Sequence, residues 1–107
     1  MIWPVSRGQV IRADIGLDEP KLLLVVSNNR RNQNLPQVLA VRLTTSDKPQ
    51  LPSIVELAHP EAFVGRVVCD DIIEVYKDEA MKIIGALSPG AMQAVNIGLM
   101  AALGIVR

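Results

Sequence analysis

The stretch KLLLVVSNNRRNQNLPQVLAVRLT, residues 21–44, decides the fold of this 107-residue chain. Two short apolar runs, residues 21–27 and 38–44, flank a polar segment. Such runs, bounded by turn residues and rich in Leu and Val, are typical of β-strands. The mostly polar ten-residue segment between them, 28–37, has the length of a functional surface loop. We therefore predict two strands joined by a loop.

Antiparallel pairing of these two strands makes a specific prediction. In the simplest register Ser27 faces Val38 and Lys21 faces Thr44, because the residue numbers of each pair sum to 65. Side chains alternate between the two faces of a strand, so Arg42 shares a face with Thr44. One end of the sheet therefore gathers a lysine, an arginine and a hydroxyl.

Further strands are predicted on both sides of this hairpin. The segments are short, contain many β-branched residues and follow one another closely, which favours antiparallel pairing. They comprise residues 9–15, 53–58, 66–69, 72–76 and 81–87. The length of the chain suits one domain, residues 1–107, and we predict a β-rich α+β fold.

A C-terminal helix of about fifteen residues is predicted between Ser88 and Gly104. Ser88 is a good N-cap, the proline after it is tolerated in the first turn, and Gly104 can end the helix. Only Gln93 and Asn96 are plainly polar between these ends, so the helix is apolar on most sides. We expect the sheet and a second subunit to cover it; a helix buried wholly within one chain is the alternative.

Composition excludes several classes of protein. Half of the residues are apolar and the mean hydropathy is +0.29, which excludes disorder. Eleven basic side chains balance eleven acidic ones, so the whole molecule has no general attraction for polyanions. Residues 1–50 hold seven basic and four acidic side chains, a net charge of +3. This half either forms a positive patch or carries ordinary solvated charges.

Few side chains are suited to metal or nucleophilic chemistry. A single cysteine, Cys69, and a single histidine, His59, exclude a disulfide framework and a zinc cluster. Cys69 lies in an apolar run beside two acids, and is interpreted as a buried small hydrophobe. His59 lies in a turn and is interpreted as exposed. The N-terminus does not resemble a signal peptide, so we expect a cytoplasmic protein without metal or cofactor.

A phosphodiester substrate would suit the group formed by Lys21, Arg42 and Thr44. Ser27, in the same predicted strand as Lys21, adds a second hydroxyl. Cations stabilise the charge of a phosphorane, and hydroxyls donate hydrogen bonds to its oxygens. Ordinary roles are the alternative: an edge lysine that extends into water, and a turn hydroxyl bonded to its own backbone.

Five segments together resemble a known family. They are RGQVIRADIG (7–16), LLVVSNN (23–29), LAVRLTTS (39–46), VVCDDI (67–72) and IGALSPGAMQAVNIGLMAALG (84–104). The chain resembles the MazF/PemK toxins of bacterial toxin–antitoxin modules over nearly its whole length. The resemblance implies a small SH3-like, PemK-type antiparallel β-barrel. It also implies a homodimeric, metal-independent, sequence-specific endoribonuclease that inhibits translation and growth and is neutralised by a cognate antitoxin.

The resemblance also implies site residues. Thr44 matches the family's catalytic threonine, whereas Lys21 stands where the family has its catalytic arginine. Arg12 stands where many members have tryptophan, and its guanidinium is a candidate replacement for that arginine. Contacts with single-stranded RNA are expected from Ser27, Asn28, Asn29, Arg30, Arg31 and Arg42.

A binding protein with the same fold is the competing hypothesis. Such a protein would resemble the gyrase-poisoning toxins, or would be a degenerate toxin that only binds antitoxin. The three aromatic residues Trp3, Phe63 and Tyr76 offer little platform for stacking single-stranded bases, which favours the competitor slightly. Cleavage of RNA in EDTA discriminates between the two.

Overall fold

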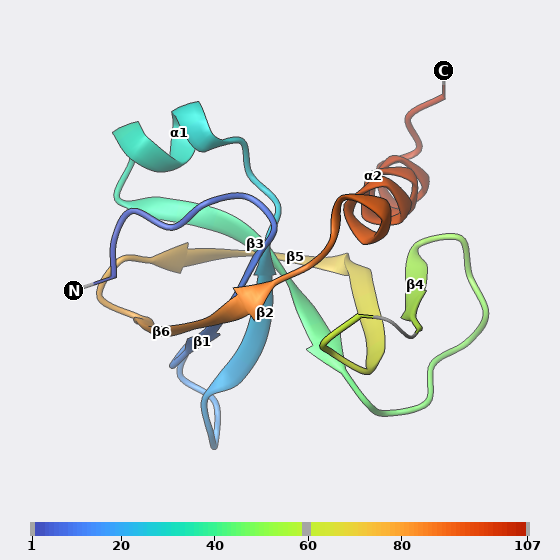
Figure 1. The fold of residues 1–107 in the computed structure, drawn as a ribbon, viewed down its shortest axis with the longest axis horizontal. Helices are drawn as coiled ribbons and strands as arrows, with labels where there is room; N and C mark the ends of the chain where they lie inside the picture. The colour runs from blue at the N-terminus through green and yellow to red at the C-terminus, as the bar shows by residue number, and fades with distance from the viewer. Residues whose placement is uncertain (1, 59–60, 107) are drawn as a thin grey trace.

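The computed structural model describes residues 2–58 and 61–106. It contains six strands and two helices in those residues (Figure 1). The elements are β1 (Gln9–Ala13), β2 (Lys21–Val25), α1 (Asn29–Asn34), β3 (Gln37–Thr44), β4 (Ile54–Leu57), β5 (Gly65–Tyr76), β6 (Ala80–Ala86) and α2 (Pro89–Leu103).

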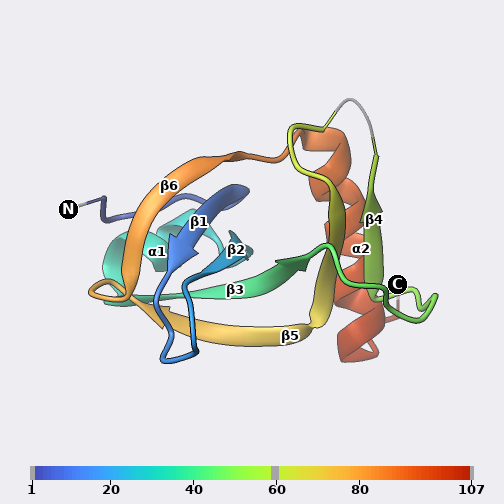
Figure 2. The ribbon, with the colours of Figure 1, turned by 90° about the horizontal axis from the view of Figure 1, so that it is seen from below.

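The strands form one antiparallel sheet in the order β4-β5-β3-β2-β1-β6. Figure 2 shows that the sheet curls, so that β6 arches over β3 and β5, with β1 and β2 between them. The helix α2 packs beside β4 and β5, at one end of this curl (Figures 1 and 2). The predicted β-rich α+β fold with a C-terminal helix is confirmed.

The predicted register of the central hairpin is also confirmed. Leu23 pairs with Arg42, and the next two residues of β2 continue the ladder with Val41 and Ala40. Each of these pairs has residue numbers that sum to 65, as the sequence predicted. A register slip of one residue would turn every core side chain to the wrong face, so the apolar pattern specifies the pairing.

The polar segment after β2 is a helix, and its prediction as a loop was wrong. The side chain of Asn28 caps α1 by accepting a hydrogen bond from the Arg31 backbone N–H at 2.9 Å. Asn32 is fully buried and donates to the Ser27 backbone oxygen at 2.9 Å. A short helix held by polar contacts has no apolar periodicity, so the hydrophobic pattern did not reveal it.

β5 is one twelve-residue strand, where the sequence predicted two. The acids Asp70 and Asp71 interrupt its apolar pattern, and a shift in its pairing with β3 falls between Val41 and Arg42. An irregularity of this kind bends a strand without ending it. The bend lets the same strand pair with β3 along its length and with β4 at its N-terminal end.

Two groups of buried side chains fill the molecule. One lies under α2 and includes Val10, Leu24, Val55 and Cys69. The other fills the opposite side of the curled sheet, and includes Ile11 and Leu23 among its members. Burial and the neighbouring carboxylate of Asp70 raise the pKa of the Cys69 thiol to about 11. Cys69 is therefore a buried hydrophobe, as predicted.

The ends of α2 are those that the sequence predicted. The hydroxyl of Ser88 accepts a hydrogen bond from the Ala91 N–H at 3.1 Å, and Gly104 ends the helix at a φ of 69°. Only Val95 and Gly98 are buried within the helix, whereas Ile97 is 66% exposed. The alternative of a helix buried wholly within one chain is therefore wrong.

In the described part of the chain, no helix is long and apolar enough to span a membrane.

Ser88→Ala is expected to lower the free energy of unfolding by about 1 kcal/mol, because a helix cap is lost. Ser88 also donates to the Glu61 carboxylate from its hydroxyl and, at 3.0 Å, from its backbone N–H. These bonds lower the pKa of Glu61. Their contribution to stability is present above the ordinary carboxyl pKa of 4.5 and declines as the pH falls below it. Urea unfolding between pH 3 and 7 should show a weaker acid destabilisation in Ser88→Ala than in the wild type.

Candidate functional site

An open cleft of about 550 Å³ lies where β2 begins and β3 ends. The β1–β2 connection closes one side of it, and the segment before β5 closes another. The lining residues are Glu19, Pro20, Lys21, Leu22, Arg42, Leu43, Thr44, Thr45, Ser46, Ala62, Phe63 and Val64. The hairpin register therefore brings Lys21, Arg42 and Thr44 into one cleft, as the sequence predicted.

The polar side of the cleft carries two cations and a hydroxyl. Lys21 Nζ lies 3.7 Å from the exposed Glu19 carboxylate, and Arg42 Nη1 lies 3.8 Å from Asp71 Oδ2. Thr44 Oγ1 accepts a hydrogen bond from the Ser46 N–H at 3.1 Å. The Thr44 hydroxyl keeps its own proton for donation, because a hydroxyl has one donor and two acceptor sites. Loosely paired cations beside a donor suit an anionic substrate.

The other side of the cleft is apolar. Leu22, Leu43 and Phe63 line it and pack against the buried group beneath α2. Val64 extends this side outward and is 75% exposed. The cleft therefore offers apolar surface and positive charge within one opening. Both kinds of surface are needed for a nucleotide, which has an apolar base face and a charged phosphate.

Arg66 supports the loop that follows Thr44, and the sequence reasoning missed it. It pairs with Thr44 across the β3–β5 ladder. Its guanidinium donates to Glu56 Oε1 at 3.0 Å and to the Ser46 backbone oxygen at 3.2 Å. The only sequence signal for this role is an arginine at the start of the apolar run 66–69. Arg66 thus connects β4, β5 and the loop behind the Thr44 hydroxyl.

Arg12 is not part of this cleft. It is exposed on β1, where it pairs with Leu22 and not with Lys21. Its side chain leaves the sheet on the face of Leu22, opposite Lys21, and is not among the residues that line the cleft. The prediction that its guanidinium joins Lys21 and Thr44 in one site is therefore not supported by the fold.

Ser27 is wrongly predicted as a substrate contact. It is 6% exposed, donates its hydroxyl proton to Asn32 Oδ1, and accepts from the Leu39 N–H at 3.0 Å. Its hydrogen-bonding groups are thus used within the protein. Six residues of extended chain separate it from Lys21, which is roughly 20 Å. Ser27 lies at the opposite end of the hairpin from the cleft.

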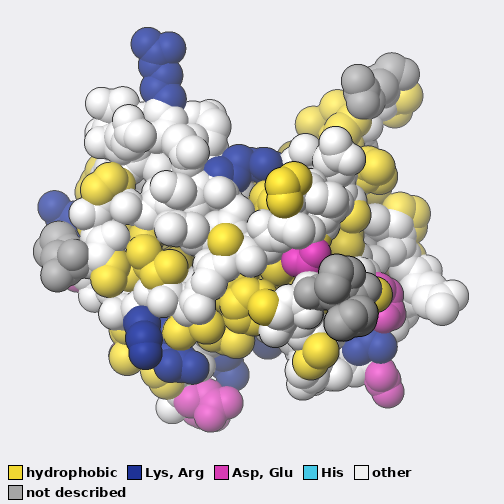
Figure 3. Space-filling view, in the orientation of Figure 1, with side chains coloured by type: hydrophobic (Ala, Val, Ile, Leu, Met, Phe, Trp, Pro, Cys, Tyr) yellow, Lys and Arg dark blue, Asp and Glu magenta, His cyan; other side chains and the backbone are white. Residues whose placement is uncertain are grey.

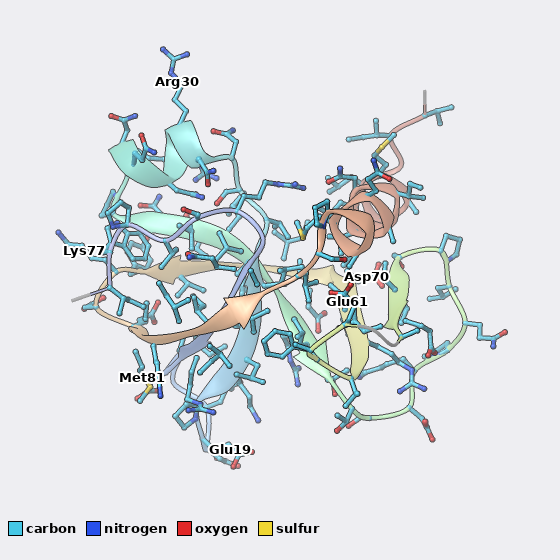
Figure 4. The ribbon with its side chains drawn as sticks, in the orientation of Figure 1. Glu19, Arg30, Glu61, Asp70, Lys77 and Met81 are labelled. Carbon is cyan, nitrogen blue, oxygen red and sulfur yellow. The ribbon has the colours of Figure 1, made fainter. Side chains whose placement is uncertain are left out.

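Arg42, also predicted to contact RNA, lines the cleft, whereas the four other predicted contacts lie at that opposite end. The Asn28 side chain caps α1, and Asn29 Oδ1 accepts from the Arg7 backbone N–H at 2.6 Å. Figure 4 shows Arg30 extending from α1 at the top of the molecule and Glu19 at the bottom. Arg31 belongs to the same short helix. These four residues form a surface separate from the cleft, and their contact with RNA stays a prediction.

His59 lies outside the described residues. Among the residues that are described, no group of three or more His, Cys, Asp or Glu side chains is arranged to hold a metal ion.

Comparisons with known proteins agree with the fold and identify the family. Residues 6–103 match the family described as PemK-like, MazF-like toxin of type II toxin-antitoxin system. The chain is 39% identical over 99 residues to "Endoribonuclease MazF1" of Mycobacterium bovis and to "Endoribonuclease MazF4" of Mycobacterium tuberculosis, covering 92% of each chain in both cases.

Solved structures give the same result. An "Endoribonuclease in complex with its cognate antitoxin from Mycobacterial species" superposes with a TM-score of 0.89 at 38% identity, over 96% of this chain and 98% of that one. A MazE–MazF structure from Deinococcus radiodurans shares the fold, with a TM-score of 0.79 at 18% identity over 95% and 97% of the two chains. The match over almost the whole chain shows that this protein belongs to the PemK-like, MazF-like toxins of type II toxin–antitoxin systems.

Proposed function

We propose that this toxin is an endoribonuclease that cuts single-stranded RNA in the cytoplasm, without a metal ion, and thereby inhibits translation and growth. The observation that carries the proposal is the gathering of Lys21, Arg42 and Thr44 in one open cleft. Support also comes from relatives of 39% identity that are named endoribonucleases.

The reaction proposed is attack by the RNA itself. The 2′-oxygen forms a bond to the adjacent phosphorus, and the bond from phosphorus to the 5′-oxygen breaks. The 2′-hydroxyl proton leaves to solvent, and Lys21 gives a proton to the leaving 5′-oxygen before it is reprotonated from water. The products are a 2′,3′-cyclic phosphate and a 5′-hydroxyl end.

Three polar side chains of the cleft, and Arg66 behind it, have a role in this scheme. Lys21 and Arg42 stabilise the negative charge that grows on the phosphoryl oxygens. The Thr44 hydroxyl donates a hydrogen bond to one of these oxygens and helps to orient the phosphate. Arg66 acts indirectly by holding the loop behind Thr44.

Purified protein is expected to cut a mixed RNA pool in the presence of EDTA. The cleavage ends should be a cyclic phosphate and a 5′-hydroxyl, which end-specific labelling and sequencing identify. Replacement of the 2′-hydroxyl at the cleaved position by hydrogen should abolish the cut, because the nucleophile is removed. An intact pool would favour the competing function, a binding protein with the toxin fold.

The toxin is further proposed to act as a homodimer joined through α2. Figure 3 shows hydrophobic side chains over this helix and the C-terminal segment. Ile97, Leu103 and Ile105 are each more than half exposed there. Contiguous apolar surface of this kind marks an interface, and a second copy of the chain is the commonest occupant.

Sedimentation should give about twice the monomer mass of 11.6 kDa at micromolar concentration. Ile97→Glu should shift the protein to monomer, because a charge is placed in the apolar contact. Glu56→Gln, a change on an exposed residue of β4, is the control and should remain dimeric. A wild-type monomer would contradict the assignment of this face.

The cognate antitoxin is the remaining partner. An acidic segment that is partly disordered before binding suits the basic side chains of residues 1–50. The solved relative in complex with its antitoxin supports this partnership.

A further inference from the structure

Phe63 is the aromatic residue of the cleft, and the polar chemistry proposed above gives it no role. The chain has three aromatic residues, and the other two lie elsewhere. Trp3 packs against the buried group on the other side of the sheet. Tyr76 is 46% exposed at the end of β5, where it pairs with Gln37. Although the chain has few aromatic residues, one of them, Phe63, therefore lies in the cleft.

The ring of Phe63 packs against the backbone of a glycine, Gly85. A Cβ atom added to Gly85 would lie 3.0 Å from Cζ and 3.3 Å from Cε2 of the ring. The edge of the ring thus rests on the bare backbone of β6, and a Cβ at position 85 would require the ring to shift by a few tenths of an ångström. Phe63 also packs against the buried group beneath α2, yet remains half-buried and lines the cleft. A ring fixed in this way loses little conformational freedom when a ligand binds.

The segment that carries Phe63 is anchored at both ends. Before it, the Glu61 carboxylate accepts the hydrogen bonds from Ser88. Figure 4 shows Glu61 next to the start of α2. After it, Gly65 begins β5 in close contact with the Thr44 backbone. The position of the ring relative to Thr44 is therefore determined by the fold.

We propose that Phe63 is a base platform, on which one nucleobase of the bound RNA stacks while the neighbouring phosphate meets Lys21 and Thr44. This rests on the proposed function of the cleft. Every nucleobase has a π-face, so stacking adds affinity with little dependence on sequence. The apolar side of the cleft suits the base of a nucleotide, and the adjacent cationic side suits its phosphate. Phe63 acts in binding, and Glu61 and Gly85 are positioning residues that act through it.

Binding is tested with a fluorescein-labelled, mixed-sequence 2′-deoxy oligonucleotide, which lacks the nucleophile and cannot be cut by the proposed reaction. Phe63→Leu retains an apolar side chain but removes the ring face, and should raise the Kd about tenfold or more. Tyr76→Leu makes the same change at an aromatic residue outside the cleft, and should leave the Kd within twofold. Thermal unfolding of both variants shows whether they remain folded.

The contact with Gly85 gives an independent variant. Gly85→Ala should raise the Kd by displacing the ring, and should add nothing further in the Phe63→Leu background, because the ring is then absent. In cleavage assays Phe63→Leu should raise KM and leave kcat within twofold, since stacking stabilises bound substrate and transition state alike.

Two results would overturn the platform. One is a Phe63→Leu protein that binds as tightly as the wild type, and the other is an additive effect of Gly85→Ala and Phe63→Leu. Wild-type protein that binds the oligonucleotide but leaves RNA intact would instead refute the nuclease and retain the platform. The two proposals therefore fail by different measurements.

Discussion

Lys21→Ala is expected to lower kcat for RNA cleavage on the order of a hundredfold or more, because it removes a cation placed where charge develops on the phosphate. The side chain of Lys21 is 28% exposed and its ammonium lies 3.7 Å from the exposed Glu19 carboxylate. Its loss should therefore leave the thermal midpoint nearly unchanged. Single-turnover cleavage of a defined RNA measures the effect on chemistry, and calorimetry measures the stability.

Two further variants show whether position 21 has the role of the family's arginine. Lys21→Arg should keep or raise activity, because the charge remains and the planar fork that grips phosphate oxygens is introduced. Arg12→Ala should remain within about twofold of the wild type, since Arg12 leaves the sheet on the other face. Full activity in Lys21→Ala, together with an inactive Arg12→Ala, would move the catalytic centre to β1.

The central hairpin could be predicted from the sequence because local pattern and global packing agree there. Its two apolar runs can bury their side chains in one register, and the turn residues limit its length. That register placed Lys21, Arg42 and Thr44 together without any structural information. The limits of α2 were predicted for the same kind of reason, since Ser88 and Gly104 are strong local signals.

The rest of the site depends on contacts between residues far apart in the chain. Phe63 enters the cleft because Gly85 leaves space for its ring and Ser88 holds Glu61. Neither contact leaves a periodic signal in the sequence. The error at Ser27 has a similar origin, because its hydroxyl is used by the buried Asn32 of a helix that the hydrophobic pattern did not reveal. Spacing along a strand predicted the face of the sheet on which each side chain lies. It did not predict that Ser27, just after β2, is buried.

Gly65→Ala is expected to have the largest effect on stability, about 2 to 6 kcal/mol of the free energy of unfolding. Gly65 has a φ of +108°, and a Cβ there would lie 2.3 Å from the Thr44 carbonyl oxygen and 3.0 Å from the Thr44 carbonyl carbon. Backbone strain at such a φ costs about 1 to 3 kcal/mol. Overpacking against a backbone atom costs about 1 to 3 kcal/mol more, because the backbone cannot rotate away as a side chain can.

Gly16→Ala separates these two contributions. Gly16 also has a positive φ, +86°, but an added Cβ would meet no atom within 4 Å. It should therefore lose only the strain, about 1 to 2 kcal/mol, in urea unfolding. A Gly65→Ala protein that remains folded should also lose kcat, because relief of the contact displaces the Thr44 backbone and with it the hydroxyl that meets the phosphate. Equal destabilisation by the two substitutions, with kcat retained in Gly65→Ala, would show that β5 does not position Thr44.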